Sequence, residues 1–212
     1  MSQSTQLSAF FRAAASAYRA TGNKDAQRIA GWLDEHAIGE IQYGVADEQP
    51  PAVLHLPTVA RSGDLNPAAQ LIATGLAHLP WTVGDLQVPA ALRDHFAFNT
   101  LIGDDCPIPD ARLYFGLFLL APQTHYPLHW HLAEELYYVL SGTAHWEQGD
   151  GVFRSRPPGT LIHHAPNEPH AMATGQAPLL AMWAWFGDLR PDTYRVDGTR
   201  GAAPPFGRGA PG

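Results

Sequence analysis

The chain has 212 residues, of which 45% are apolar, enough to bury one good core. The formal net charge is −7 and the 13 basic residues are spread along the sequence, so we expect no nucleic-acid partner and no anionic membrane surface. No segment reaches the roughly 18 apolar residues of a membrane span. Arg12 interrupts the only candidate signal segment, and the single cysteine, Cys106, excludes an intramolecular disulfide. These features predict a soluble, cytoplasmic protein.

Two segments near the N-terminus carry apolar residues at helical spacing. The first covers residues 4–20 and is followed by Gly22, a plausible stop, and the second covers residues 25–36. We expect a helical hairpin that packs on the rest of the chain or on a second subunit, so a homodimer is one expected assembly. The aromatic residues of both helices are expected to be core packing.

The next segment is rich in proline and gives weaker signals. Residues 53–56 are a candidate short strand within the mixed stretch 43–63. Asn66 is a good helix cap and is followed by Pro67, so a helix is expected to run from there to about residue 78.

After residue 100 the pattern changes to short apolar runs broken by Gly, Pro and Asp, which is typical of an antiparallel barrel. The expected strands cover residues 112–120, 137–141, 143–148, 159–164, 171–174 and 179–186. The expected layout is a helical extension with a connecting segment at 1–99, a β-barrel with a metal site at 100–195, and a flexible tail at 196–212.

The stretch 126–142, YPLHWHLAEELYYVLSG, concentrates polar side chains. Because side chains alternate between the two faces of a strand, His129, His131, Glu135 and Tyr137 are expected to point to one side. Two imidazoles and a carboxylate suit a divalent zinc, iron, manganese or nickel ion and leave positions open for a substrate. Seven of the eleven histidines lie between residues 125 and 170, and a metal site predicts such clustering.

This spacing resembles the first motif of the cupin family: HxH, three or four residues, Glu, six residues, Gly. His129, His131, Glu135 and Gly142 match every position. The resemblance implies a mainly β protein with N-terminal helices, built on a cupin barrel, which is a double-stranded β-helix or jelly roll.

A second cupin motif supplies a fourth ligand after a Pro-Gly turn and a further proline. Pro158–Gly159, Pro166 and His170 resemble it, although the usual glycine between the later proline and the histidine is missing. The adjacent histidines 163 and 164 therefore remain alternatives, with His163 as the better reserve ligand.

The flanking tyrosines extend the pattern to YPxHxHxxxExY, which resembles the cupin-type dimethylsulfoniopropionate (DMSP) lyases over roughly residues 65–190. The matching positions are Tyr126, Pro127, His129, His131, Glu135 and Tyr137. The resemblance implies a metal-dependent carbon–sulfur lyase that cleaves DMSP to acrylate and dimethyl sulfide by β-elimination. It also implies one divalent metal held by His129, His131, Glu135 and His170.

The same resemblance implies residue roles around the metal. Tyr137 would be the base that removes the proton next to the carboxylate, since a nearby dication lowers the pKa of a phenol. Tyr126 and His129 would orient the substrate or complete the metal shell.

A sulfonium substrate also needs an aromatic wall, because ring faces attract cations without forming a strong ion pair. The candidates for substrate binding are Trp183, Trp185, Tyr126 and Tyr138, with the two tryptophans first. Packing within the barrel wall is the alternative role for the tryptophans.

Two other functions use the same ligands. One is a different metal-dependent cupin enzyme, a dioxygenase or isomerase acting on a small acid or sugar. The other is a non-catalytic cupin that binds a small molecule, which is disfavoured because no segment resembles a helix-turn-helix. A polar core without metal is also disfavoured, since unpaired buried charge costs several kcal/mol.

Overall fold

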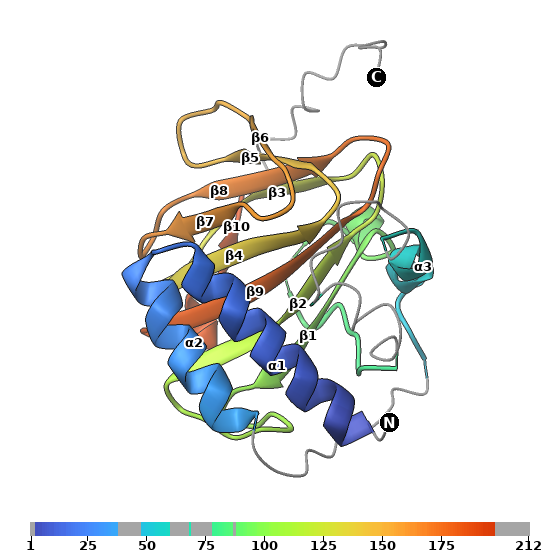
Figure 1. The fold of residues 1–212 in the computed structure, drawn as a ribbon. Helices are drawn as coiled ribbons and strands as arrows, with labels where there is room; N and C mark the ends of the chain where they lie inside the picture. Colours follow the sequence, from blue (N-terminus) through green and yellow to red (C-terminus); the bar gives the residue numbers. More distant parts are fainter. Residues whose placement is uncertain (1–2, 38–47, 60–67, 69–77, 87, 198–212) are drawn as a thin grey trace.

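The computed structural model describes residues 3–37, 48–59, 68, 78–86 and 88–197. Two five-stranded antiparallel sheets pack face to face, and two N-terminal helices cover the outer surface of the first sheet (Figure 1). In spatial order, the first sheet consists of β1 (Phe96–Ile102), β2 (Leu113–Leu120), β9 (Leu179–Gly187), β4 (Ala133–Ser141) and β7 (Leu161–His164). The second sheet consists of β10 (Arg195–Val196), β3 (His125–Trp130), β8 (His170–Thr174), β5 (Ala144–Glu147) and β6 (Arg154–Arg156).

From β3 to β9 the chain passes repeatedly from one sheet to the other, as in a jelly roll. The predicted fold class, a mainly β cupin-type jelly roll with N-terminal helices, is confirmed. The strands form two separate sheets, so the hydrogen-bond ladder is not closed into one barrel. The turn from β4 to β5 depends on Gly142: its φ is +77°, and a Cβ there would lie 2.0 Å from the Pro178 carbonyl oxygen.

The six predicted strands are all present, with ends that differ by at most a few residues. The expected strands did not include β1, β6 or β10, and β3 was anticipated only as part of one extended stretch at 126–142. Of these, β6 has the polar sequence RSR and β10 has only two residues, so neither carries an apolar alternation.

The predicted strand at 53–56 is wrong. Residues there form a 3-10 turn, η1 (Pro51–His55), followed by the short helix α3 (Leu56–Val59). Pro50 and Pro51 favour the turn because their fixed φ suits its start, and the Pro50 carbonyl accepts a bond from the amide of Val53 at 3.0 Å. The helix expected between residues 66 and 78 lies largely outside the described residues, as does the tail beyond residue 197.

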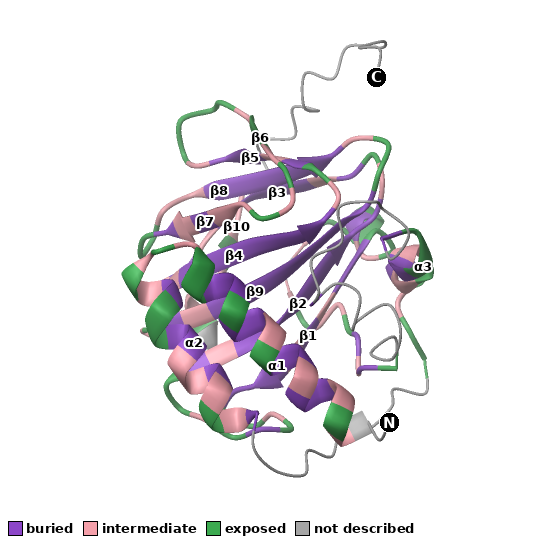
Figure 2. Cartoon of the chain, viewed as in Figure 1, coloured by how far each residue is buried: buried purple, intermediate pink, exposed green. Residues whose placement is uncertain are grey.

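The helical hairpin consists of α1 (Gln3–Ala20) and α2 (Lys24–His36). Asn23 caps α2, since its side chain accepts bonds from the amides of Asp25 and Ala26 at 2.9 and 3.0 Å. The apolar side of the hairpin is buried against the first sheet (Figure 2), where the rings of Phe10 and Phe11 lie 6.1 and 6.0 Å from that of Phe115. The hairpin thus packs on its own chain, and the homodimer stays a prediction.

An ion-pair cluster fixes the end of α2 to the segment before β2. Nε2 of His36 lies 2.8 Å from the Asp110 carboxylate, and Arg112 contacts both Asp110 and Glu35 at 2.7 Å.

Among the described helices, none is long and apolar enough to cross a membrane.

Strand β4 separates two cores, because its side chains alternate between the faces of the first sheet. Leu136, Tyr138 and Leu140 belong to the outer core under the helices. Tyr137 and Val139 belong to the inner core between the sheets. The alternation expected for Glu135 and Tyr137 is therefore present on β4, whereas His129 and His131 lie on β3 of the other sheet and in the turn after it. The inner face carries the polar residues described next.

Candidate active site

Three histidines and one glutamate from both sheets meet in the interior. His129 on β3 pairs across the ladder with His170 on β8, His131 lies in the turn after β3, and Glu135 projects from β4 of the other sheet. The Glu135 carboxylate oxygen Oε2 lies 3.2 Å from Nε2 of His131 and 3.1 Å from Nε2 of His170. All four side chains are buried. The structure thus brings together the four predicted metal ligands.

His131, Glu135 and His170 form the tightest part of this group. Their ligand atoms all lie within 4.8 Å of one another. His129 stands beside them, with its ring 4.0 Å from that of His170 and 4.9 Å from that of Tyr126. It therefore bridges the cluster and the first candidate tyrosine.

Backbone carbonyls fix the tautomer of each histidine. Nδ1 of His129 donates to the Pro127 carbonyl at 2.9 Å, Nδ1 of His131 to Ala133 at 3.0 Å, and Nδ1 of His170 to Glu168 at 2.9 Å. A carbonyl can only accept, so the hydrogen is on Nδ1, and in the neutral ring Nε2 keeps its lone pair. Metal-binding histidines are oriented in this way.

The charges of the cluster also suit a cation. Burial, followed by the neighbouring His170, lowers the pKa of His129 well below its usual value, so its ring is neutral. Burial alone would raise the pKa of Glu135, but His131 and His170 outweigh it and hold that pKa well below its usual range. Nε2 of His170 makes no aligned hydrogen bond within the described chain. An ionised buried carboxylate and two imidazole nitrogens within 4.8 Å of one another fit a divalent metal, which the fold and this cluster support.

Trp185 holds the second oxygen of Glu135. Its indole Nε1 donates to Oε1 at 2.7 Å, and its ring lies 4.2 Å from the ring of His131. The carboxylate is therefore oriented with Oε2 toward the histidines. This contact was not expected, since we predicted Trp185 as a wall for the substrate.

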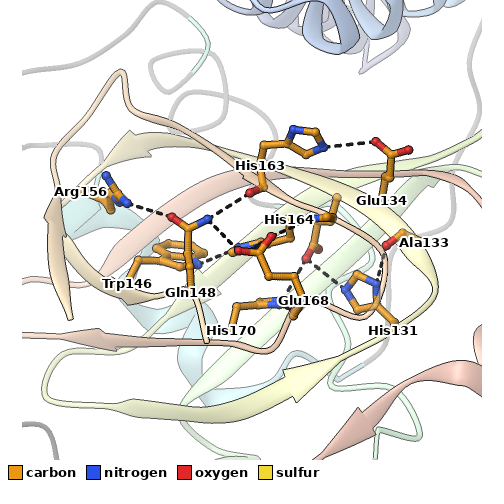
Figure 3. Close-up of polar contacts among 12 residues, drawn as sticks. His131, Ala133, Glu134, Trp146, Gln148, Arg156, His163, His164, Glu168 and His170 are labelled. Carbon is orange, nitrogen blue, oxygen red and sulfur yellow. Dashed lines mark hydrogen bonds and ion pairs between the residues drawn. The ribbon is translucent and has the colours of Figure 1, made fainter. Parts of the chain in front are cut away.

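His163, which the sequence offered as a reserve ligand, does not point toward the cluster. Its Nε2 lies 3.2 Å from Glu134 on the outer face of the sheet, and Figure 3 shows this pair pointing away from His131 and His170. The parity of β7 sends adjacent side chains to opposite faces, so His164 points inward instead.

His164 packs against the ring of His170. The two rings stack 3.8 Å apart at 10°, and Trp146 Nε1 donates to Nε2 of His164 at 3.1 Å (Figure 3). Because that bond occupies the lone pair on Nε2, His164 is not placed to act as a ligand through that atom.

A cavity of about 250 Å³ opens beside the cluster. Aromatic side chains dominate its wall, and the described lining contains no lysine or arginine. The lining residues are Leu86, Phe98, Thr100, Cys106, Tyr114, Phe118, Tyr126, His129, Glu135, Tyr137, Trp183, Trp185 and Tyr194.

Tyr137 and Tyr126 both face this cavity. Burial, followed by the negative charge of Glu135, raises the pKa of Tyr137 well above its usual value. Burial likewise raises the pKa of Tyr126, whose hydroxyl lies 2.9 Å from the hydroxyl of Tyr194. Both phenols are therefore protonated at neutral pH in the protein without a cation.

Tyr138 lies on the opposite face, so its prediction as a substrate-binding residue is corrected. Its ring is 6.0 Å from that of Tyr18 in α1, within the outer core.

Sequence reasoning also missed Tyr194, which follows η3 (Pro191–Thr193). No local pattern marks Tyr194, since it reaches the cavity only through the pairing of β10 with β3.

Comparisons with known proteins found one matching family model and similar curated proteins. A family model described as dimethylsulfoniopropionate lyase matches residues 27–181. The chain is 32% identical over 158 residues to the putative DMSP lyase DddL of Cereibacter sphaeroides, covering 71% of this chain and 66% of that protein. It is 31% identical over 121 residues to the DMSP lyase DddQ of Ruegeria pomeroyi, covering 57% of this chain and 60% of that protein. These matches span less than two thirds of the relatives' own length.

Two solved structures share the fold. A crystal structure reported for the DMSP lyases RdDddP and RnDddQII superposes with a TM-score of 0.74 at 23% identity, covering 92% of this chain and 100% of that one. The DMSP lyase DddQ from Ruegeria pomeroyi gives a TM-score of 0.62 at 24% identity, covering 88% and 99%. At these identities the likeness extends to the fold.

Proposed function

Because the chain belongs to the dimethylsulfoniopropionate lyase family, we propose that it is a metal-dependent carbon–sulfur lyase cleaving DMSP to acrylate and dimethyl sulfide. The observation that carries the proposal is one cavity lined by His129 and Glu135 of the His/Glu cluster, by the Tyr137 phenol and by an aromatic wall. The substrate is a zwitterion with a carboxylate at one end and a sulfonium at the other.

The lining matches both ends of such a molecule. No cationic side chain lies among the described lining residues, so the carboxylate must find its counter-charge in a metal and its hydrogen bonds in phenols. Ring faces can attract the sulfonium without forming an ion pair. Trp183 lies on the same side of β9 as Trp185, and both reach the cavity.

We propose that one divalent zinc, iron, manganese or nickel ion is held by His131, Glu135 and His170, with His129 as the fourth ligand on the side of Tyr126. When bound, such an ion supplies positive charge beside the substrate carboxylate and favours the ionised form of a nearby phenol. The orienting bonds to Nδ1 and the bond from Trp185 to Glu135 support this ligand set.

In the proposed reaction the Tyr137 phenolate removes a proton from the carbon next to the carboxylate. The electron pair of that C–H bond forms the double bond of acrylate, while the C–S bond breaks and its pair leaves with dimethyl sulfide. Tyr126 orients the carboxylate through its hydroxyl, and the burial of Tyr137 limits the access of water to the base.

The test is headspace detection of dimethyl sulfide from purified protein mixed with DMSP. The protein is stripped of metal and then loaded separately with zinc, iron, manganese and nickel. We expect dimethyl sulfide and acrylate in equal amounts with at least one metal and neither product from the stripped protein. Oxygen consumption without dimethyl sulfide would instead indicate a cupin dioxygenase and would contradict the proposal.

A further inference from the structure

The segment that follows β9 returns to the cluster and is attached there. Arg195 and Val196 of β10 pair with Trp130 and His129 of β3, and the amide of Asp197 donates to the Leu128 carbonyl at 2.7 Å. Just before the pairing, Thr193 accepts a bond from the amide of Leu132 at 3.3 Å. Bonds on both sides thus hold position 194 against the strand that carries His129.

The ring of Tyr194 lies over the ligands. Its centroid is 5.5 Å from that of His129 and 6.2 Å from that of His131, to which it is nearly parallel at 11°. It is also 6.4 Å from the ring of Trp185. Tyr194 therefore completes the aromatic wall next to the proposed metal.

Its hydroxyl meets only one of the two candidate phenols, that of Tyr126, at 2.9 Å. Tyr126 is itself held rigidly: its ring is edge-on to Phe96 at 5.2 Å and to Phe118 at 5.5 Å. In a pair of hydroxyls one donates and the other accepts, and the accepting hydroxyl keeps its own hydrogen for a third group.

Either hydroxyl of this pair can donate to the other. Burial raises the pKa of both phenols, so both carry their hydrogen at neutral pH. Both side chains line the cavity. The arrangement in which Tyr194 donates therefore leaves the hydrogen of Tyr126 free to turn toward a ligand in the cavity.

We propose that Tyr194 is a positioning residue: it donates to the Tyr126 hydroxyl and so directs the hydrogen of Tyr126 toward the substrate carboxylate. The inference rests on the proposed lyase function for the identity of the substrate. It adds to that function a reason why the chain returns to β3 after the jelly roll is complete. Hydrogen bonds in a chain also strengthen one another, so Tyr126 becomes a better donor.

The test is a double-mutant cycle on the metal-loaded protein with Tyr194→Phe, Tyr126→Phe and both changes together. Both changes keep the ring, and metal content and circular dichroism are measured for each variant. We expect Tyr194→Phe to lower kcat/KM for dimethyl sulfide release by about 3–10-fold, the effect of one neutral hydrogen bond. Tyr126→Phe should cost at least as much, and the double variant should be no worse than Tyr126→Phe alone.

Tyr18→Phe is the matched control, because its hydroxyl is buried in the outer core and has no hydrogen-bond partner in the described chain. It should leave kcat/KM unchanged. Losses that multiply in the double variant, or full activity of Tyr194→Phe, would overturn the positioning role while leaving the lyase function intact.

A second readout does not require turnover. Calorimetry of acrylate binding to the same four proteins should show weaker binding in Tyr194→Phe only when Tyr126 is present. If the wild-type protein releases no dimethyl sulfide, the lyase proposal fails, and this cycle alone decides whether Tyr194 acts through Tyr126. Equal weakening in both backgrounds would overturn the inference.

Discussion

The two faces of β4 place similar residues in opposite surroundings. On the outer face Glu134 pairs with partly exposed His163, and Tyr138 packs against Tyr18 of the helical layer. On the inner face Glu135 is buried against histidines and an indole, and Tyr137 faces the cavity. One step along the strand thus separates a surface ion pair from a candidate ligand, and a packing phenol from a candidate base. Strand parity, rather than residue type, decides which side chain can take part in chemistry.

The adjacent glutamates should give the largest contrast. We expect Glu135→Ala to release most of the metal and to lower dimethyl sulfide release by more than about 100-fold. Replacing a residue that only hydrogen-bonds to a metal ligand already lowers metal affinity or activity by about 10–100-fold, and Glu135 is itself a proposed ligand. Glu134→Ala should keep both the metal and the activity, because it removes only an exposed pair. Elemental analysis of the purified variants measures this difference. Full metal occupancy in Glu135→Ala would contradict the ligand set.

The adjacent tyrosines should give the next contrast. Tyr137→Phe should retain the fold and the metal but lose activity by at least about 10²-fold, the lower end for a positioned acid–base group. Tyr138→Phe should change stability at most. Initial rates of dimethyl sulfide release are compared at equal metal content, after circular dichroism shows that both variants are folded. An active Tyr137→Phe protein would shift the role of base to Tyr126 or His129.

The two tryptophans of β9 should differ more subtly. Trp183 donates to the Asn99 carbonyl at 3.1 Å and not to a ligand, so Trp183→Leu tests the aromatic wall alone. We expect it to weaken DMSP binding by about 2–30-fold and acrylate binding much less, because only DMSP carries a cation. Trp185→Leu should weaken both, since it also frees Glu135. Calorimetry on metal-loaded protein gives the four affinities, and equal losses at Trp183 would indicate simple packing.

The smallest effect should come from the cluster that fixes α2 to the jelly roll. The hydrogen bond from Arg112, together with His36, holds the pKa of Asp110 well below its usual value, although burial opposes this. A depressed folded-state pKa stabilises the protein above the unfolded pKa of about 4, and the stabilisation is lost as the pH falls below it. We expect roughly 1 kcal/mol, because Arg112 is half-exposed and screened by solvent.

Urea unfolding of the metal-free protein between about pH 6 and pH 3 measures the contribution of ionised Asp110 to the free energy of unfolding. The free energy of unfolding should fall with pH less steeply in Asp110→Asn than in the wild type. Parallel curves for the two proteins would show that Asp110 is not the titrating group.

Local patterns predicted much of this molecule, and the failures have physical causes. The spacing of His129, His131 and Glu135 brings these residues together because the motif lies on two consecutive strands, β3 and β4, and the short turn between them. Alternation on β4 already placed Tyr138 away from the ligands, and it was a better guide than aromatic character. His163 could not be rejected from the sequence, because a one-residue shift in the pairing register of β7 would have turned its side chain inward.

Tyr194 depends on contacts that no local pattern contains. It reaches the cavity through β10, a two-residue strand that pairs with a segment more than sixty residues earlier. The bond from Trp185 to Glu135 likewise joins residues 50 positions apart. Such contacts follow from the register of paired strands, which the sequence alone did not specify.

The central claim is that a metal held by the His/Glu cluster lowers the pKa of the Tyr137 phenol. A spectroscopic titration tests this claim most directly. Tyrosinate absorbance is followed against pH for the wild type and for Tyr137→Phe, each with and without metal. Without metal, burial and Glu135 raise the pKa of Tyr137, so no tyrosinate should form near neutral pH. With metal, we expect one tyrosinate per chain to form at a much lower pH and to be missing in Tyr137→Phe. Identical curves with and without metal, or a signal that persists in Tyr137→Phe, would contradict the claim.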